Sequence, residues 1–583
     1  MKPSELLELK AKQSGIEYPQ MTVTELLEKN NGGHLDDVAI KYYGNNITYE
    51  QLFKKIDEYN RAFASYGIQK GDYVSVCLPT IPESIYIFFA LNKIGAKFHT
   101  ILPTATTEQI VEILQHNKSK MFITLDSLYY RVGEAIQLMD VPYKVKVSAN
   151  NSLPPIIKQI KQLSDLLKKE TYKNIPLDFL AIKQFLKNGN GYSTISNPWK
   201  SGDIAAVTNS SGSTARNKGT KLTDYGFNAM VCNYQKALTD VHRGQSFHSC
   251  IPVLYSTGLS NSVNLPLQLG LPTILEPIFD KNVYPERFMK NKPNLSIVPV
   301  PHAKALLDYL RKVYKENNAK NKDMLSFVDV FSVGGSHMPI PWEEELGFYL
   351  EYYGSSSAIG KGYGLSEHNS ALTISTKKMI GAAGIVLPGV IFGIFDSVTG
   401  EELDFGQEGQ IRAISPCDMA GYFNNEALNE AYFQTDENGK RWGHTGDIGR
   451  LELIDGEVWL FYSGREKEII NINGNDILLP KIQAKIFECD LIDDCELVVI
   501  KQDDDNHPVA HIVLKNGSIS AEEILKKLHE LFKNHENLEP YAYKIHDSLP
   551  VLISGKVDKP LLSSELNDYI KHAGERVKNI SFY

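Results

Sequence analysis

Strand and helix patterns alternate through the first 150 residues, and this alternation constrains the fold more than any other feature. Apolar residues recur at helical spacing in TYEQLFKKIDEYNRAFASYGI and form one stripe that ends at Gly67: Leu52, Ile56, Tyr59, Ala62 and Phe63. GDYVSVCLP then indicates a short buried strand, and residues 85–94 indicate a second helix. Alternation of this kind predicts an α/β fold in which helices cover parallel sheets.

The later part of the chain changes pattern twice. The alternation resumes at Ile204 and runs to about Pro388, after which a Gly- and acid-rich stretch predicts several short β-strands. The tail is βαβ-like, with EEILKKLHELFKN as its clearest amphipathic helix. We therefore expect a large N-terminal domain over residues 1–466, made of αβ-layered subdomains and a small β-rich subdomain. A small, mobile α+β lid domain would follow over residues 467–583.

Composition excludes several classes of protein. The chain has 583 residues, 42% hydrophobic and 22% charged, which are values of ordinary globular proteins. A net charge of −9 argues against general binding to nucleic acid. The longest apolar run, over residues 85–91, is far shorter than the roughly 20 residues of a membrane span. We expect no transmembrane segment, and the oligomeric state stays open.

Two further features bear on location and surface. The N-terminus is polar and does not resemble a signal peptide. Six scattered cysteines without a CxxC pair fit a reducing cytoplasm, so a cytoplasmic enzyme is expected. Residues 155–200 are Lys-rich and loosely patterned, which predicts a surface insertion.

The densest chemical signal is the segment TNSSGSTARNKG at residues 208–219. Its small hydroxyl residues and glycines let backbone N–H groups and hydroxyls converge on phosphate oxygens, while Lys218 adds positive charge. On composition alone, a polar surface linker is the alternative. The P-loop pattern fails here because Gly219 follows Lys218, and GxGxxG fails at residues 360–364, which read GxGxG.

Five motifs resemble, in order, those of the adenylate-forming superfamily, which includes acyl-CoA synthetases, peptide-synthetase adenylation domains and firefly luciferase. SSGSTARNKG resembles TSGSTGxPKG, and GYGLSE at residues 362–367 resembles GYGxTE. TGD at residues 445–447, GREK at 464–467 with Gly474, and SGKVD at 554–558 resemble the other three. ITYEQL and GDYVSV also fit, so the resemblance covers nearly the whole chain.

The resemblance implies a reaction and a set of roles. The family joins a carboxylic acid to ATP, releases pyrophosphate and passes the acyl group to a thiol. The residues implied to bind ATP or AMP are Ser210, Ser211, Gly212, Ser213, Thr214, Lys218, Gly335, Ser336, His337, Tyr363, Gly364, Asp447 and Arg465. Those implied in catalysis are Lys556, Glu367 and Ser366, with Glu367 also the Mg²⁺ ligand. The acyl pocket would include Tyr255, Gly334 and Gly335, the thiol channel Gly474, and the hinge Lys467.

Departures from the family pattern bear on the substrate. Peptide-synthetase domains hold the substrate's α-amino group with an Asp that follows an aromatic residue. The matching segment here, residues 252–258, resembles PxFHxxG of acyl- and aryl-CoA ligases, with Tyr255 in place of His and no carboxylate. An α-ammonium group would be left unpaired there, which lowers the amino-acid interpretation.

We therefore expect an acyl-CoA synthetase that acts on a fatty or aryl acid with ATP, Mg²⁺ and CoA. The alternative is a stand-alone adenylation enzyme that loads a carrier-protein phosphopantetheine. It stays open because Asp476, Lys481 and Gln483 depart from the pattern of CoA ligases. An inactive binding homologue is disfavoured because the five charged residues of the motifs are all present: Lys218, Glu367, Asp447, Arg465 and Lys556.

Overall fold

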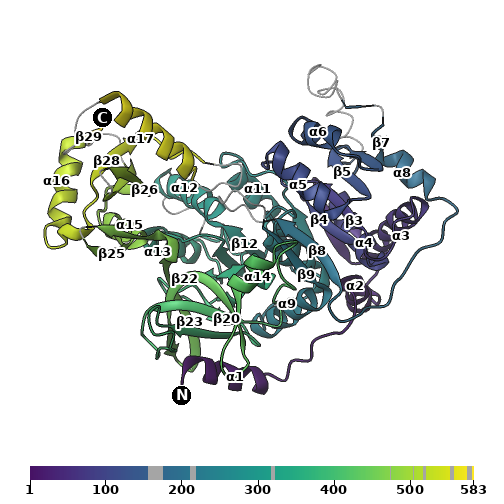
Figure 1. Cartoon of the computed structure of the whole chain (residues 1–583), viewed down its shortest axis with the longest axis horizontal. Coiled ribbons are helices and arrows are strands. Elements are labelled where there is room, and N and C mark those ends of the chain that lie inside the picture. Colours follow the sequence, from purple (N-terminus) through teal and green to yellow (C-terminus); the bar gives the residue numbers. More distant parts are fainter. Residues whose placement is uncertain are drawn as a thin grey trace.

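The structure is a computed structural model of the chain (Figure 1). It describes residues 1–154, 175–176, 178–209, 218–316, 322–472, 474–502, 505–515, 520–551, 557–573 and 581–582. The helical stripe expected before Gly67 is confirmed as α3 (Tyr49–Ser65), and all five of its apolar positions are buried. The next strand is β3 (Tyr73–Cys77), and the second helix is α4 (Pro82–Ile94), of which only Lys93 is not buried.

One seven-stranded sheet forms the first layer of the N-terminal part. Its strand order is β7 (Leu180–Ala181), β6 (Tyr143–Val147), β5 (Met121–Leu125), β3, β4 (Lys97–Thr100), β8 (Ile204–Asn209) and β9 (Gly219–Thr223). All neighbours pair in parallel except β8 and β9, which form an antiparallel pair around the expected phosphate loop. Three helices pack around this sheet: α5 (Thr107–Asn117), α6 (Tyr129–Leu138) and α8 (Ile182–Asn188).

A second seven-stranded sheet follows. Its order is β14 (Ile359–Lys361), β13 (Val330–Gly334), β12 (Leu295–Pro299), β10 (Phe247–Ser249), β11 (Thr273–Leu275), β1 (Val38–Tyr42) and β2 (Asn45–Thr48). Only the β1–β2 pair is antiparallel. The helices that pack around it are α2 (Val23–Asn31), α9 (Asp224–Ala237), α10 (Leu265–Gln268), α11 (Tyr284–Asn291), α12 (Val300–Glu316) and α13 (Ile340–Tyr352).

The expected β-rich subdomain is an antiparallel sheet, seen at the lower left of Figure 1. Its order is β17 (Thr373–Ile374), β18 (Ile385–Val386), β23 (Glu457–Arg465), β22 (Arg441–Ile454), β20 (Gly409–Ile414) and β19 (Ile391–Phe395), and β21 (Phe433–Thr435) pairs with β22. The N-terminal helix α1 (Pro3–Gln13) lies against this sheet, where Ser4 Oγ donates to Glu402 Oε2 at 2.7 Å.

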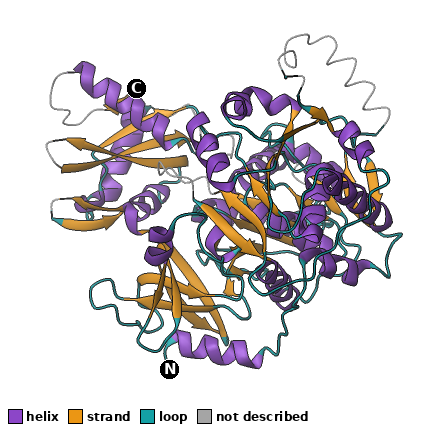
Figure 2. Cartoon of the chain, turned by 45° about the vertical axis from the view of Figure 1, so that its right-hand side comes forward, coloured by secondary structure: helices purple, strands orange, loops and turns teal. Residues whose placement is uncertain are grey.

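The C-terminal segment forms a separate lobe, at the upper left of Figure 1. A hairpin of β24 (Ile469–Ile472) and β25 (Asn475–Leu478) precedes a sheet ordered β26 (Ile492–Gln502), β27 (Asp505–Leu514), β28 (Ala542–His546) and β29 (Ser581–Phe582). Its helices are α15 (Leu479–Phe487), α16 (Ala521–Phe532) and α17 (Lys559–Ala573). Because β27 and β28 pair in parallel around α16, the βαβ expectation is confirmed. Figure 2 shows the alternating layers and this mixed lobe.

One expectation is partly wrong. Residues 155–174 and 177 of the predicted insertion lie outside the described residues, and residues 190–200 lie at the surface without helix or strand, but α8 between them packs into the core. Phe185 of α8 is fully buried and contacts Phe63 of α3, with ring centroids 5.2 Å apart. The Lys-rich composition gave no indication of this short helix, whose apolar residues Ile182 and Phe185 are buried in the core. Among the described helices, none is both long enough and apolar enough to cross a bilayer.

Candidate active site

The expected adenine and acyl residues lie at the carboxyl ends of β13 and β14. Gly334 ends β13, and β14 leads directly into Tyr363. A Cβ atom on Gly334 would lie only 3.1 Å from the backbone oxygen of Gly362, so glycine permits the close approach of the two strand ends. Gly335 follows with φ +83°, which turns the chain away. Ligands of α/β sheets bind at such carboxyl edges, especially where the topology changes.

Tyr363, Asp447 and Arg465 meet although they are far apart in the chain. The Tyr363 hydroxyl donates to Asp447 Oδ2 at 2.7 Å, and Arg465 Nε lies 3.4 Å from Asp447 Oδ1. Asp447 and Arg465 face each other as register partners on β22 and β23. Burial raises the pKa of Asp447 to about 6, although Arg465 and the Tyr363 hydroxyl act to lower it. At neutral pH the group is therefore a largely ionised acceptor.

The TGD motif has a local reason. The Thr445 hydroxyl donates to the Ile411 backbone oxygen at 2.6 Å and accepts from the Asp447 N–H at 3.2 Å. Gly446 adopts φ +69°, a left-handed conformation that favours glycine. Thr445 thus anchors the turn that directs Asp447 inward. It is a positioning residue that the sequence analysis did not single out.

Two more aromatic groups border this cluster. The ring of Tyr462 lies with its centroid 6.0 Å from that of Tyr363 and 6.4 Å from that of His337. Burial, and then the charge of Lys361, lower the pKa of His337 to about 4, so its ring is neutral at pH 7. Sequence reasoning missed Tyr462. Its position three residues before Arg465, on the strand that carries the GREK motif, was the available signal.

Glu367 is held from the neighbouring segment. The Tyr422 hydroxyl donates to Glu367 Oε1 at 2.7 Å, and the Met419 N–H donates to the Glu367 backbone oxygen at 2.8 Å. Glu367 lies in the turn η3 (Ser366–His368), so Ser366 stands next to it. Among the described residues, none donates a hydrogen bond to the other carboxylate oxygen, Oε2.

Residues 420–423 also pair with β9, the strand that follows the expected phosphate loop. Residues 210–217 lie outside the described part, and with them Ser210, Ser211, Gly212, Ser213 and Thr214. Half-buried Lys218 precedes β9, along which the Phe423 N–H donates to the Gly219 oxygen at 2.6 Å and the Lys221 N–H donates to the Gly421 oxygen at 3.0 Å. Residues 420–423 therefore connect β9 with Glu367, because they pair with β9 and include Tyr422, whose hydroxyl bonds Glu367.

The profile of the AMP-binding enzyme family matches residues 27–423 of this chain. The chain belongs to the AMP-binding enzyme family. The match confirms the expected adenylate-forming superfamily and, with it, an AMP-binding ligase. The two mainly parallel sheets with their helices confirm the expected α/β class.

Relatives of this AMP-binding enzyme span nearly the whole chain. It is 24% identical over 541 residues to the probable 4-coumarate–CoA ligase 3 of Dictyostelium discoideum, covering 92% of each chain. It is 25% identical over 574 residues to the long-chain-fatty-acid–CoA ligase of Bacillus subtilis, covering 95% of this chain and 97% of the relative. The crystal structure of the anthranilate CoA ligase AuaEII in complex with anthranoyl-AMP covers 95% of this chain and 98% of its own, with TM-score 0.76 and 16% identity.

The residues around Glu367 fit a magnesium ion that accompanies the nucleotide. Among the described residues, no group of three or more His, Cys, Asp or Glu side chains is arranged to hold a metal. Mg²⁺ commonly binds through one or two carboxylates together with substrate phosphates and water. A single carboxylate, one oxygen of which has no donor among the described residues, is compatible with that mode.

The remaining expected residues do not join this cluster in the part of the chain that the structure describes. Lys556 lies outside the described residues. Lys467 is exposed in the turn η4 (Glu466–Glu468), which follows β23 directly. Gly474 is exposed at the tip of the β24–β25 hairpin, with φ +82° and no atom within 4 Å of a Cβ built on it. In this arrangement Gly474 therefore faces solvent and lines no channel. Tyr255 is half-buried at the turn that leads into η2 (Gly258–Asn264).

An ion-pair cluster joins the C-terminal lobe to the large part of the AMP-binding enzyme. Asp493 at the start of β26 lies 3.0 Å from Lys304 Nζ and 2.6 Å from Arg311 Nη1, both on α12. Trp342 of α13 donates from Nε1 to the Asp493 backbone oxygen at 2.7 Å. Burial alone would raise the pKa of Asp493, but Lys304 and Arg311 lower it below its ordinary value.

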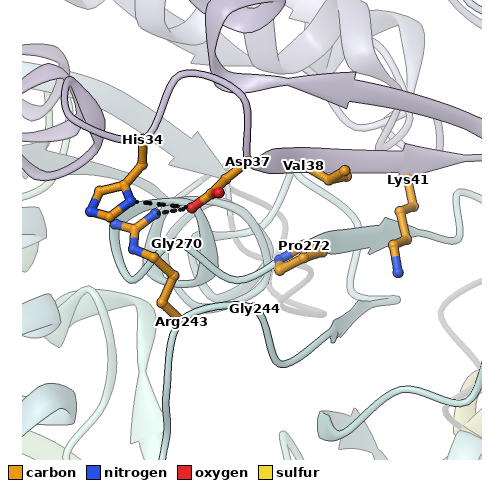
Figure 3. Close-up of a pocket in the computed structure, with 8 residues that line it drawn as sticks. All are labelled: His34, Asp37, Val38, Lys41, Arg243, Gly244, Gly270 and Pro272. Carbon is orange, nitrogen blue, oxygen red and sulfur yellow. Dashed lines mark hydrogen bonds and ion pairs between the residues drawn. The ribbon is translucent and has the colours of Figure 1, made fainter.

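A cavity of about 520 Å³ lies at the amino ends of the strands of the second sheet, near the start of β1 and just before β10 and β11 (Figure 3). Arg243 in its wall is engaged in the fold, since Nη1 lies 3.3 Å from Asp37 Oδ2 and Nη2 donates to Asn31 Oδ1 at 2.9 Å. His34 also pairs with Asp37, at 3.4 Å. None of the expected site residues that the structure describes lines this cavity, so it is separate from the cluster around Asp447.

Proposed function

We propose that this AMP-binding enzyme activates a fatty or aryl carboxylic acid with ATP to an acyl-adenylate, releases pyrophosphate and transfers the acyl group to CoA. The observation that carries the proposal is the meeting of Tyr363, Asp447 and Arg465, with Glu367 near enough to Asp447 for its charge to act on the pKa of that group. Named CoA ligases align with the chain over nearly its full length, which supports the class of reaction.

The chain's own residues account for nucleotide binding. The Asp447 carboxylate accepts hydrogen bonds from the ribose hydroxyls, and Arg465 supplies planar donors beside it. Lys218 and the loop of residues 210–214 surround the β- and γ-phosphates, and Tyr363 lies against adenine. Ser366 keeps a hydroxyl near the α-phosphate, where two anions must approach each other. Bound at Glu367, Mg²⁺ would stabilise the negative charge of the leaving pyrophosphate.

The proposal also assigns a role to the C-terminal lobe, which would act as a mobile lid. The boundary between residues 466 and 467 falls in η4, between the β-rich sheet and the C-terminal lobe. We propose that Lys467 is the pivot, that Lys556 bridges the acid's carboxylate and the α-phosphate in one lid position, and that Gly474 borders the thiol arm in another. The exposure of Gly474 agrees with a lid set for adenylation rather than for transfer.

A pyrophosphate-release assay tests this function. The protein is incubated with ATP, Mg²⁺ and single acids from fatty, aryl and amino-acid sets, with and without CoA. We expect acid-dependent pyrophosphate release and, with CoA present, an acyl-CoA product. Turnover of free amino acids without turnover of simple acids would contradict the proposal. Product only with a pantetheinylated carrier protein would replace CoA as the acceptor.

A further inference from the structure

The cavity at the amino ends of the second sheet has a positively charged lining. Lys41 and Arg243 line it together with a single carboxylate, Asp37, and His34 is the only other titratable group in its wall. The chain as a whole carries a net charge of −9, so the positive lining does not follow from the general charge of the protein. A volume of about 520 Å³ lies in the range of sites for small molecules.

Arg243 is held in a fixed position at one end of this cavity. Its Nη2 donates to the Asn30 backbone oxygen at 3.1 Å and to Asn31 Oδ1 at 2.9 Å, and its Nη1 donates to Asp37 Oδ2 at 3.3 Å. A Cβ atom on Gly270 would lie 2.3 Å from Arg243 Cζ, so glycine is needed for the guanidinium to lie there. Among the described residues, these contacts use three of its five N–H groups. A guanidinium fixed in this way is preorganised for an oxyanion.

Asp37 does not neutralise the cavity. Arg243 Nη1 and His34 Nδ1 both approach the same oxygen, Asp37 Oδ2, at 3.3 Å and 3.4 Å. Both distances exceed the roughly 2.8 Å of a good charge-assisted hydrogen bond. No other carboxylate among the described residues lines the cavity. One loosely held carboxylate therefore faces Arg243, and none faces Lys41.

Lys41 lies at the other end of the cavity and lacks a partner. It is half-buried on β1, where its register partners are Ile274 of β11 and Asn46 of β2. Among the described residues, none forms an ion pair or a side-chain hydrogen bond with its ammonium group. Withdrawing an ammonium group from water without an anion is unfavourable. Figure 3 shows Lys41 at one end, the Arg243 cluster at the other, and Pro272 between them.

We infer that this cavity binds a small organic dianion, with one acidic group at Lys41, the other at Arg243, and a short apolar spacer against Pro272 and Val38. Carboxylate and phosphate groups share the required chemistry, since both accept hydrogen bonds from ammonium and guanidinium groups. A monoanion occupies only one of the two ends and therefore binds less tightly. The inference concerns a second site and does not rest on the proposed function.

Calorimetric titration at pH 7 and low ionic strength tests the inference. The dianionic probes are glutarate, adipate and pentane-1,5-bisphosphonate, and the matched monoanions are pentanoate and hexanoate. We expect at least one dianion to bind with a Kd below about 1 mM and about tenfold tighter than the monoanion of the same chain length. The tighter of the two dianion classes identifies the acidic group. Dianions that all bind more weakly than this, or no more tightly than the monoanions, would overturn the inference.

One variant and a matched control assign the binding to this cavity. Lys41→Gln removes the charge at similar length and should weaken dianion binding about tenfold or more. It should leave the melting temperature unchanged, because Lys41 has no described partner to lose. The control is Lys54→Gln, on the exposed surface of α3, where Lys54 pairs with Glu50 at 2.8 Å. Unchanged binding in Lys41→Gln, or equal weakening in both variants, would contradict a site at Lys41.

Hydrogen–deuterium exchange with adipate locates the site without a substitution. Protection should increase at residues 32–42 and 243–248, which contribute Lys41 and Arg243 to the lining. Protection confined to residues 359–367 and 445–465 would place the dianion at the proposed nucleotide site and overturn the inference. Neither measurement depends on acyl-adenylate formation, so a failure of the proposed function would leave this test intact.

Discussion

At the scale of single residues, the carboxylate of Asp447 links nucleotide binding to pH. It accepts charge-assisted hydrogen bonds on both oxygens only while ionised, and burial raises its pKa to about 6. As pH falls through 6 the protonated form increases and the ribose contact weakens. We expect kcat/KM for ATP to fall about tenfold between pH 7 and pH 5. Initial rates at limiting ATP across this range are the measurement.

The control for this pH dependence is Asp447→Asn, which keeps the shape but does not ionise between pH 5 and pH 7. Its kcat/KM for ATP should be lower at pH 7 and nearly flat over the range. If wild type and Asp447→Asn gave parallel pH profiles, another group would be responsible for the titration.

Tyr422 is expected to tune the metal site through Glu367. In Tyr422→Phe the carboxylate loses its only described side-chain donor, so the Mg²⁺ concentration for half-maximal rate should rise about tenfold. Glu367→Gln should lower kcat by about a hundredfold. The matched control is Tyr432→Phe, because the Tyr432 hydroxyl bonds His368 Nε2 at 2.8 Å. It should lower stability without changing the Mg²⁺ dependence, and an equal shift in both Tyr→Phe variants would rule out this role.

At the scale of elements, the pairing of residues 420–423 with β9 is expected to position the proposed phosphate loop. Gly421 adopts φ +121°, and a Cβ there would lie 2.8 Å from Asn429 Oδ1, the atom that accepts from the Tyr422 N–H. Gly421→Ala should therefore displace Asn429, loosen this pairing and raise KM for ATP about threefold to tenfold, as roughly 1 kcal/mol of positioning is lost. Steady-state kinetics at varied ATP check it.

The control for this pairing is Gly439→Ala. Gly439 has a similarly left-handed φ of +77°, but a Cβ placed on it would meet no atom within 4 Å. This variant shares the backbone strain, and should cost about 1 kcal/mol of stability with KM for ATP unchanged. A similar rise in KM for both glycine variants would assign the effect to general destabilisation.

Local pattern predicted some elements and not others. The stripe of α3 is long and periodic, so its burial could be read directly from residues 52–63. Helix α8 has seven residues in a Lys-rich region, and the burial of Phe185 depends on Phe63, more than a hundred residues earlier. No local period records such a contact. The pairing of residues 420–423 with β9 was unpredictable for the same reason, because strand partners distant in sequence leave no mark on either segment alone.

The site shows the same division. Motif resemblance located Tyr363, Asp447 and Arg465, and the structure brings these three together. Tyr422 was not singled out, and Thr445 was noted only as part of the TGD motif, since each acts by holding Glu367 or Asp447 rather than by standing out in composition. The sequence SNSVN shows that η2 is polar, but the sequence alone does not show that these polar side chains are buried.

At the scale of the whole molecule, Asp493 is expected to hold the lid in its present position. In Asp493→Ala, Lys304 and Arg311 lose their partner across the interface. Acyl-adenylate formation should slow about threefold to tenfold, while transfer from synthetic acyl-adenylate to CoA should not slow. Raising ionic strength should act in the same direction on wild type. The control is Glu530→Gln, which breaks an exposed pair with Lys533 inside the lobe and should change neither step.

Alternation of the lid predicts separable half-reactions. Lys556→Ala should abolish acyl-adenylate formation yet still transfer the acyl group from synthetic acyl-adenylate. Gly474→Leu should do the reverse, because a side chain at the hairpin tip would occupy the space of the thiol arm. Lys467→Pro should slow transfer by restricting φ at the pivot. The two half-reactions, assayed separately, decide this: equal loss of both in a folded Lys556→Ala protein would refute alternation.

The position of Arg465 has a consequence for inhibitor design. This residue ends β23, pairs with Asp447 and stands two residues before Lys467, so one short stretch of backbone connects the proposed nucleotide contact with the proposed pivot. A compound that occupies the ribose position and engages Arg465 would restrain the hinge as well as exclude the nucleotide. Resistance to such a compound should then arise from substitutions in residues 465–468 as readily as from substitutions among the residues that touch it.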